Sequence, residues 1–81
     1  GPDEAEYREI FQRECAMRGI AYDDAAVTHL FATWYAGRRE MRGSHPRDIV
    51  EAVVDAARHD DRPPVITPAS LDDACRSYFL A

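Results

Sequence analysis

Four stretches of the chain repeat apolar residues at intervals of three and four positions, the periodicity of one face of an α-helix. The clearest has Val27, Leu30, Phe31 and Trp34 at i, i+3, i+4 and i+7. Glycine, proline and paired aspartates separate the stretches. At 81 residues, the chain is long enough for one small domain. We therefore predict an all-α domain of four helices joined by short connections, a small four-helix bundle.

The predicted helices span about residues 3–18, 24–35, 44–59 and 68–79. Gly19 is suited to the residue that follows the first helix. Side chains that favour helix starts precede the others, with proline in the first turn of the last two. These are Asp23 or Asp24 for the second helix, Ser44 or His45 before Pro46 for the third, and Thr67 before Pro68 for the fourth.

The apolar faces of the four helices form the predicted core. Helix 44–59 is apolar over most of its circumference, so we expect it to be the central and most buried helix. The connectors 20–22 and 65–66 could add a two-residue β pairing. The predicted core residues are Tyr7, Ile10, Phe11, Cys15, Met17, Val27, Leu30, Phe31, Trp34, Ile49, Val50, Ala52, Val53, Val54, Ala56, Ala57, Leu71, Ala74, Cys75 and Tyr78.

The composition excludes several classes of protein. No apolar run approaches the ~20 residues that span a bilayer. The formal net charge of -5 argues against a dedicated binder of duplex DNA. Cys15 and Cys75 lie on apolar faces, so we expect two reduced core thiols and a cytoplasmic protein. We expect no metal site, because His29, His45 and His59 fall on separate elements.

The first two residues, Gly1-Pro2, are typical of the scar left when a protease removes an expression tag. On this interpretation, residues 3–81 form a single domain taken from a longer protein. The alternative is a natural terminus left by processing. The chain contains no phosphate-binding loop, no dinucleotide fingerprint and no nucleophile elbow. We therefore expect no self-contained enzyme.

Four arginines lie between positions 38 and 47, where only Glu40 and Asp48 oppose them: Arg38, Arg39, Arg42 and Arg47. Arg47 falls in the first turn of helix 44–59, where backbone N–H groups and the helix dipole favour an anion. Two interpretations remain open at this point. Arg47 binds a phosphate supplied by another part of the protein, or it forms an ion pair with Asp48, Glu51 or another exposed carboxylate.

The order of short motifs along residues 4–79 resembles the C-terminal α-helical lid of bacterial-type AAA+ ATPases. The motifs are residues 8–11, 19–23, 44–49 and 65–68. In that family, the third lid helix opens with a Gly-x-Ala/Pro-Arg-like motif. Here Ser44 stands where glycine is common, and Arg47 matches the sensor-2 arginine of the family.

The resemblance implies that Arg47 contacts the γ-phosphate of ATP, with residues Ser44, His45 and Pro46 also close to the nucleotide. An upstream α/β subdomain would hold Mg-bound ATP. Its partners would be that subdomain and neighbouring subunits of a homo-oligomeric, hexameric ring. The lid alone would be a monomer, would bind neither membrane nor nucleic acid, and would be part of an ATPase only in the intact protein. Arg38, Arg39 and Arg42 receive no role from it.

Two alternatives need no ATPase. The chain could be a stand-alone helical protein–protein interaction module, with Tyr35, Tyr78 and Phe79 as its exposed surface. It could also bind DNA through helix 44–59 as a recognition helix. The apolar character of that helix and the negative net charge disfavour the second alternative.

Overall fold

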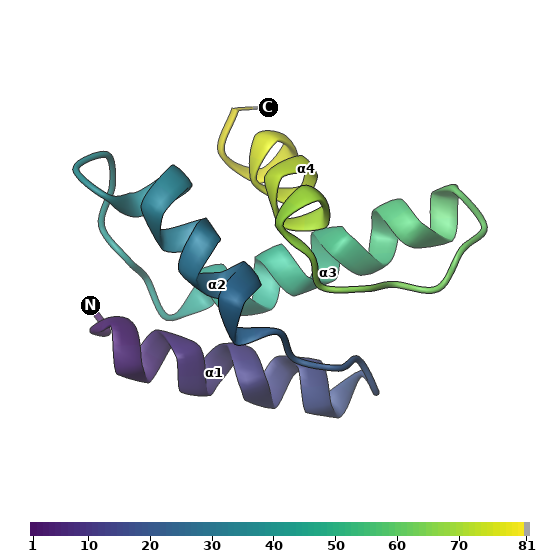
Figure 1. The fold of residues 1–81 in the computed structure, drawn as a ribbon, viewed down its shortest axis with the longest axis horizontal. Helices are drawn as coiled ribbons and strands as arrows, with labels where there is room; N and C mark the ends of the chain where they lie inside the picture. The colour runs from purple at the N-terminus through teal and green to yellow at the C-terminus, as the bar shows by residue number, and fades with distance from the viewer. Residues whose placement is uncertain (81) are drawn as a thin grey trace.

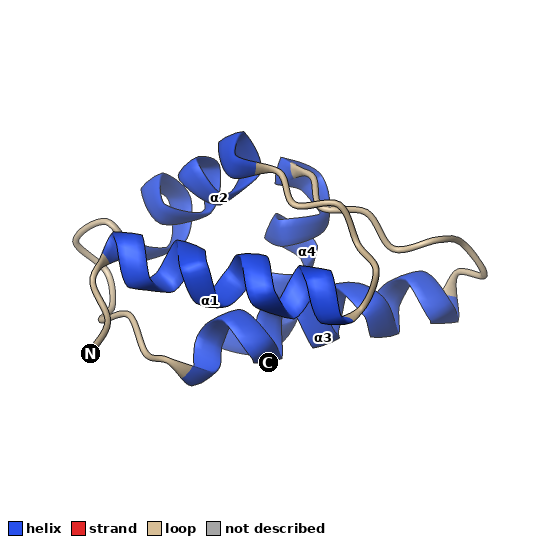
Figure 2. Ribbon diagram, turned by 90° about the horizontal axis from the view of Figure 1, so that it is seen from below, coloured by secondary structure: helices blue, strands red, loops and turns tan. Residues whose placement is uncertain are grey.

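The computed structural model describes residues 1–80, which fold into four helices (Figure 1). Helix α1 is Glu4–Met17, and α2 is Asp24–Leu30. A short π-helical turn, η1 (Phe31–Tyr35), continues α2 directly. Helix α3 is Ser44–His59, and α4 is Pro68–Leu80. Figure 2 shows helices and loops over the described part of the chain, and the predicted all-α fold of four helices is confirmed.

Side chains cap three of the helices, and the caps of α2 and α4 were predicted. The Asp3 carboxylate accepts a hydrogen bond from the Glu6 N–H at 2.8 Å, and Glu6 bonds back to the Asp3 N–H. Asp23 caps α2, and Thr67 caps α4 through the N–H of Ser70. These caps satisfy backbone N–H groups that have no partner within the helix.

The start of α3 differs from the prediction. Neither Ser44 nor His45 caps it. The N-cap residue is Gly43, which has no side chain that could accept a hydrogen bond from the helix. Ser44 is instead the first helical residue, followed by Pro46 in the first turn as expected. Helix α3 therefore begins without an acidic or hydroxyl cap.

The predicted helix 24–35 is helical throughout, but its last turn is wider than an α-helix. The N–H of Ala36 bonds to the carbonyl of Phe31 at 2.9 Å, five residues back. Three side chains of this turn, Phe31, Trp34 and Tyr35, are buried. Gly37 then reverses the chain with a positive φ of 66°, a conformation that glycine adopts without strain.

Helix α3 packs against both α1 and α4 and buries more residues than any other helix, as predicted. In Figure 1, α1 and α3 follow the long axis of the domain, and α2 and α4 cross them. The side chains of Tyr7, Phe11, Leu30, Ile49 and Leu71 are fully buried where these helices meet.

The predicted β pairing and three of the predicted core positions are wrong. Connectors 20–22 and 65–66 run near each other and line one shallow hollow, but residues 1–80 contain no β bridge. Each connector is only two or three residues long, too short for a stable ladder. Met17 is the last residue of α1 and is 71% exposed, although Cys15 in the same turn is buried. Ala56 and Tyr78 are exposed as well.

Both cysteines are free and buried, as predicted. Burial raises the pKa of Cys15 to about 11 and that of Cys75 to about 12, so both remain unreactive thiols at neutral pH. Within residues 1–80, no helix combines the length and apolar character needed to cross a membrane.

Candidate functional site

The four predicted nucleotide-contact residues open α3, and they divide into two pairs. Ser44 and Arg47 are exposed. His45 is only 7% exposed, and Pro46 is fully buried. A ligand approaching this helix end therefore meets Ser44 and Arg47, while His45 and Pro46 face the interior. Core side chains surround His45 and Pro46, and their contact with a nucleotide stays a prediction.

Arg47 lies beside a carboxylate that a residue of α4 holds in place. Its Nε donates a hydrogen bond to Oδ1 of Asp48 at 3.2 Å. The Tyr78 hydroxyl donates to the other oxygen, Oδ2, at 2.8 Å. The bond from Tyr78 and the neighbouring guanidinium of Arg47 lower the pKa of the Asp48 carboxyl, so it is ionised at neutral pH. The Arg47 side chain remains 59% exposed.

His45 belongs to a buried chain of hydrogen bonds that links three elements. The hydroxyls of Tyr7 in α1 and Tyr35 in η1 are 2.8 Å apart, and the Tyr35 hydroxyl is 2.8 Å from Nδ1 of His45. Both bonds are satisfied when Tyr7 donates to Tyr35 and Tyr35 donates to a neutral His45. In the opposite direction, the buried Tyr7 proton would have no acceptor among the described contacts. These hydrogen bonds hold the first turn of α3 against α1 and η1, and they thereby position Arg47.

Because His45 is buried, the domain is expected to lose stability as the pH falls below about 6.5. Burial and then the charge of Arg42 lower the folded-state pKa of His45, which Asp48 partly opposes and Arg39 reinforces. The unfolded chain therefore takes up this proton first, near the ordinary pKa of ~6.5. The contribution of His45 is complete above that pH and is lost as the pH falls towards the lower folded-state pKa. The contribution of Asp72, whose pKa is also lowered, is lost only below ~3.9.

Urea unfolding at about pH 7.5 and about pH 5.5 measures this loss. The matched variant is His45→Asn, whose side-chain oxygen can accept the Tyr35 hydrogen bond but does not titrate. We expect a smaller difference in unfolding free energy between the two pH values for the variant. An equal difference in both proteins would show that another group causes the pH dependence.

The other three arginines of the cluster lie on the loop of residues 36–43, which we call the arginine loop. Arg38 and Arg42 are exposed. Arg39 is half-buried: its guanidinium carbon is 4.0 Å from the ring centre of Phe79 and 5.8 Å from that of Trp34. Its Nη1 also donates to the Trp34 carbonyl at 2.9 Å. Arg39 therefore joins the loop to η1 and α4 and is not merely a solvated charge.

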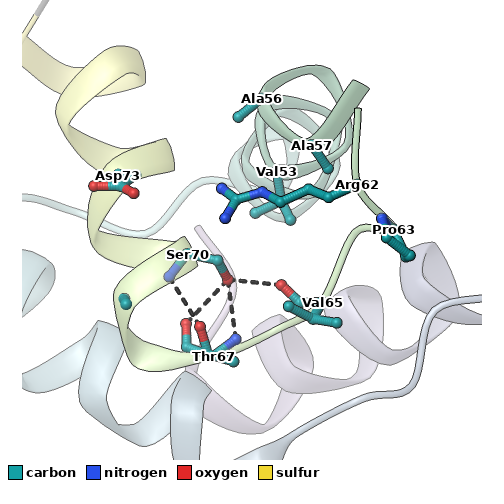
Figure 3. A pocket seen from close by; sticks show the side chains of 10 residues that line it. Val53, Ala56, Ala57, Arg62, Pro63, Val65, Thr67, Ser70 and Asp73 are labelled. Carbon is teal, nitrogen blue, oxygen red and sulfur yellow. Dashed lines mark hydrogen bonds between the residues drawn. The ribbon is translucent and has the colours of Figure 1, made fainter. Parts of the chain in front are cut away.

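Besides the shallow hollow between connectors 20–22 and 65–66, two further hollows lie outside the α3 start. One, of about 400 Å³, lies between α1, η1 and the arginine loop. The other, of about 120 Å³, lies between the second half of α3, the following loop and the start of α4 (Figure 3). Figure 3 shows Arg62 extending across this smaller hollow above Thr67 and Ser70, whose polar groups already bond to each other. Neither of these two hollows is lined by a predicted nucleotide-contact residue.

Sequence reasoning missed the role of Tyr78, which it placed in the core, and considered Asp48 only as an ion-pair partner. The predicted interaction surface also differs from the structure, because Tyr35 is buried at 4% exposure. The contact between Tyr78 and Asp48 joins residues 30 positions apart, so no local spacing could reveal it. Among residues 1–80, no group of three histidine, cysteine or carboxylate side chains is arranged to hold a metal ion.

Comparison with known proteins adds a family to this description. No curated protein and no solved structure matches the chain. A family model described as a domain of unknown function, DUF8689, matches residues 3–77, which include all four helix starts and the Arg47 site. The chain therefore belongs to the DUF8689 family.

Proposed function

We propose that this chain is the C-terminal lid of an AAA+ ATPase and that Arg47 contacts the terminal phosphate of ATP bound to an upstream α/β subdomain. One observation carries the proposal. Arg47 presents an exposed guanidinium in the first turn of α3, at a helix start without an acidic cap. The order of the four motifs in the sequence supplies the family to which such an arginine would belong.

The local chemistry suits a phosphate group. Only one guanidinium nitrogen of Arg47, Nε, is engaged, and its partner is the adjacent Asp48. The terminal nitrogens make no hydrogen bond to residues 1–80, and a planar guanidinium can bind two phosphate oxygens at once. The positive end of the α3 dipole adds to the attraction. Arg47 would thus stabilise negative charge that develops on the phosphate during hydrolysis.

The buried residues next to Arg47 would have a positioning role. His45 and Pro46 tie the first turn of α3 to the core, and Asp48 is tied to α4 by Tyr78. A change in the contact made by Arg47 would therefore move the whole domain and not a loose side chain. Rigid-body rotation of such a domain is an established way to pass a local change to a neighbouring subunit. This supports a lid that couples hydrolysis to motion of a ring.

This role reduces the predicted contact set. Ser44 and Arg47 would face the nucleotide, and His45 would act through the position of Arg47. ATP would be the substrate, with Mg²⁺ and the phosphate-binding loop supplied by the upstream subdomain. The lid alone would contribute too few contacts to hold a nucleotide tightly.

The test is the sequence upstream of Asp3 in the protein's own gene. The proposal expects G-x-x-x-x-G-K-[ST] within about 150–200 residues of that point, together with ATP hydrolysis by the intact protein. A reading frame that begins at or near Asp3 would overturn it. The chain would then be a stand-alone helical interaction module, for which the hollow beside the arginine loop is the best surface.

A further inference from the structure

The arginine loop contains the three arginines that form no ion pair within residues 1–80. Each of the other arginines lies within 4.0 Å of a carboxylate oxygen. The unpaired residues are Arg38, Arg39 and Arg42, and the paired residues are Arg8, Arg13, Arg18, Arg47, Arg58, Arg62 and Arg76. The net charge is -5, so carboxylates are plentiful, and yet within residues 1–80 all the arginines without an ion pair lie on this loop.

The unpaired charge is held at a defined place. The carbonyl of Tyr35 accepts hydrogen bonds from the N–H groups of Arg38 and Arg39, which close the loop onto η1. Arg39 stacks on Phe79 and bonds through one nitrogen to the Trp34 carbonyl. These contacts limit the freedom of the loop, so less conformational entropy is lost when a partner binds.

The same loop forms one wall of an apolar hollow. Ala36, Arg39 and Met41 line it from the loop, and Phe31, Ala32 and Tyr35 line it from η1. Its volume of about 400 Å³ falls within the ~300–1,000 Å³ range of ligand-binding clefts. In Figure 1, the loop passes beside the N-terminal end of α1, the helix that supplies Glu4 and Arg8 to the opposite wall.

We propose that this hollow binds an acidic segment of a partner protein, with one bulky apolar side chain in the hollow and carboxylates on the arginine loop. Complementary charge favours an acidic segment, because the loop carries three arginines and one acidic residue, Glu40. The apolar floor selects a side chain that benefits from burial. Arg47 takes no part, so this inference is independent of the ATPase proposal.

A nucleic acid fits this surface less well than a peptide does. The rings of Phe31 and Tyr35 are 5% and 4% exposed, so they offer no platform on which a base could stack. Glu4 lies on the wall opposite the arginine loop, where it would repel a continuous phosphate backbone. A peptide can direct its carboxylates to one wall only.

The test uses nine-residue fluorescent peptides with a central leucine, phenylalanine or tryptophan flanked by aspartate and glutamate. Matched peptides have lysine in place of the acids or glycine in place of the central residue. We expect the best acidic peptide to bind at least tenfold more tightly than either matched form, and more weakly as salt rises. Amide shifts in NMR spectra of the domain should map to residues 31–41.

Two variants separate charge from shape. Arg38→Glu with Arg42→Glu reverses exposed charges that have no partner, and Ala32→Trp fills the hollow without changing charge. Each should weaken binding of the acidic peptide at least tenfold. Arg58→Glu with Arg76→Glu is the matched control, because both residues are exposed and lie on other elements, and it should retain binding. Circular dichroism and thermal melting confirm that each variant is folded.

Several results would overturn the inference. These are the absence of binding by every acidic peptide, equal binding of the lysine or glycine forms, and shifts that map elsewhere. Tighter binding of a single-stranded oligonucleotide would assign the surface to nucleic acid. Dimerisation of the domain that is abolished by Ala32→Trp would assign it to a second copy of the chain.

Discussion

If the proposed lid function holds, replacing Arg47 with alanine in the intact protein is expected to lower kcat for ATP hydrolysis by about 10²-fold or more. Loss of one group that stabilises transition-state charge typically costs this much, and an arginine at a transferring phosphoryl group can cost more. The effect should fall mainly on kcat, because in the proposed arrangement an upstream phosphate-binding loop would supply most of the affinity for ATP. Steady-state ATPase kinetics measure both parameters.

The matched control is Arg58→Ala, which removes an exposed arginine from the last turn of the same helix. It should leave kcat unchanged. Both variants should melt at nearly the wild-type temperature, because exposed ion pairs such as Arg47–Asp48 contribute little to stability. A wild-type kcat for ATP hydrolysis in the Arg47→Ala protein would exclude a role for this residue in hydrolysis.

The helices were predictable because apolar periodicity marks each of them and a cap or a first-turn proline marks where it begins. Pro46 and Pro68 fall in first turns, Asp3, Asp23 and Thr67 supply caps, and Gly19 has the positive φ expected beyond α1. The exposed position of Arg47 follows from the same information, because a residue after Pro46 turns away from the buried stripe. Propensity, caps and periodicity all agree at these positions.

The environment of His45 could not be predicted, because it depends on three segments at once. A histidine in a short motif at a helix start is equally compatible with ligand binding and with burial. The buried hydroxyl of Tyr35 decides between them, since it contacts both Tyr7 and His45. A shift of η1 by one residue would remove the contact. The apolar periodicity around Tyr35 is too coarse to exclude such a shift.

The arginine loop shows a second limit of the sequence. Arg38, Arg39 and Arg42 read as one charge cluster, but only the structure separates the stacked Arg39 from its exposed neighbours. Ion pairing with residues distant in the sequence also decides which arginines remain without partners. The pairing of Arg8 with Asp24 across two helices, for example, has no local signature.

Replacing Tyr35 with phenylalanine is expected to lower the free energy of unfolding by about 2–4 kcal/mol. The substitution keeps the ring and its packing but removes the hydroxyl that serves two buried groups. The Tyr7 hydroxyl and Nδ1 of His45 would each lose a partner in a place that water cannot easily reach. An unsatisfied buried polar group costs ~1–3 kcal/mol, and here one change creates two. Urea unfolding at neutral pH measures the loss.

Tyr22→Phe is the matched control, since it removes the same atom from a tyrosine whose hydroxyl donates to the exposed Asp24. Water can replace that partner, so the expected loss is below about 0.5 kcal/mol. Comparable losses in the two variants would mean that the hydroxyl chain adds nothing beyond an ordinary surface hydrogen bond. A large loss of unfolding free energy for Tyr35→Phe alone would instead show that the buried hydrogen bonds of Tyr7, Tyr35 and His45 attach the start of α3 to the core. On the proposed lid function, the two predictions concern the same site, because Tyr35→Phe should then also lower kcat of the intact protein through the position of Arg47.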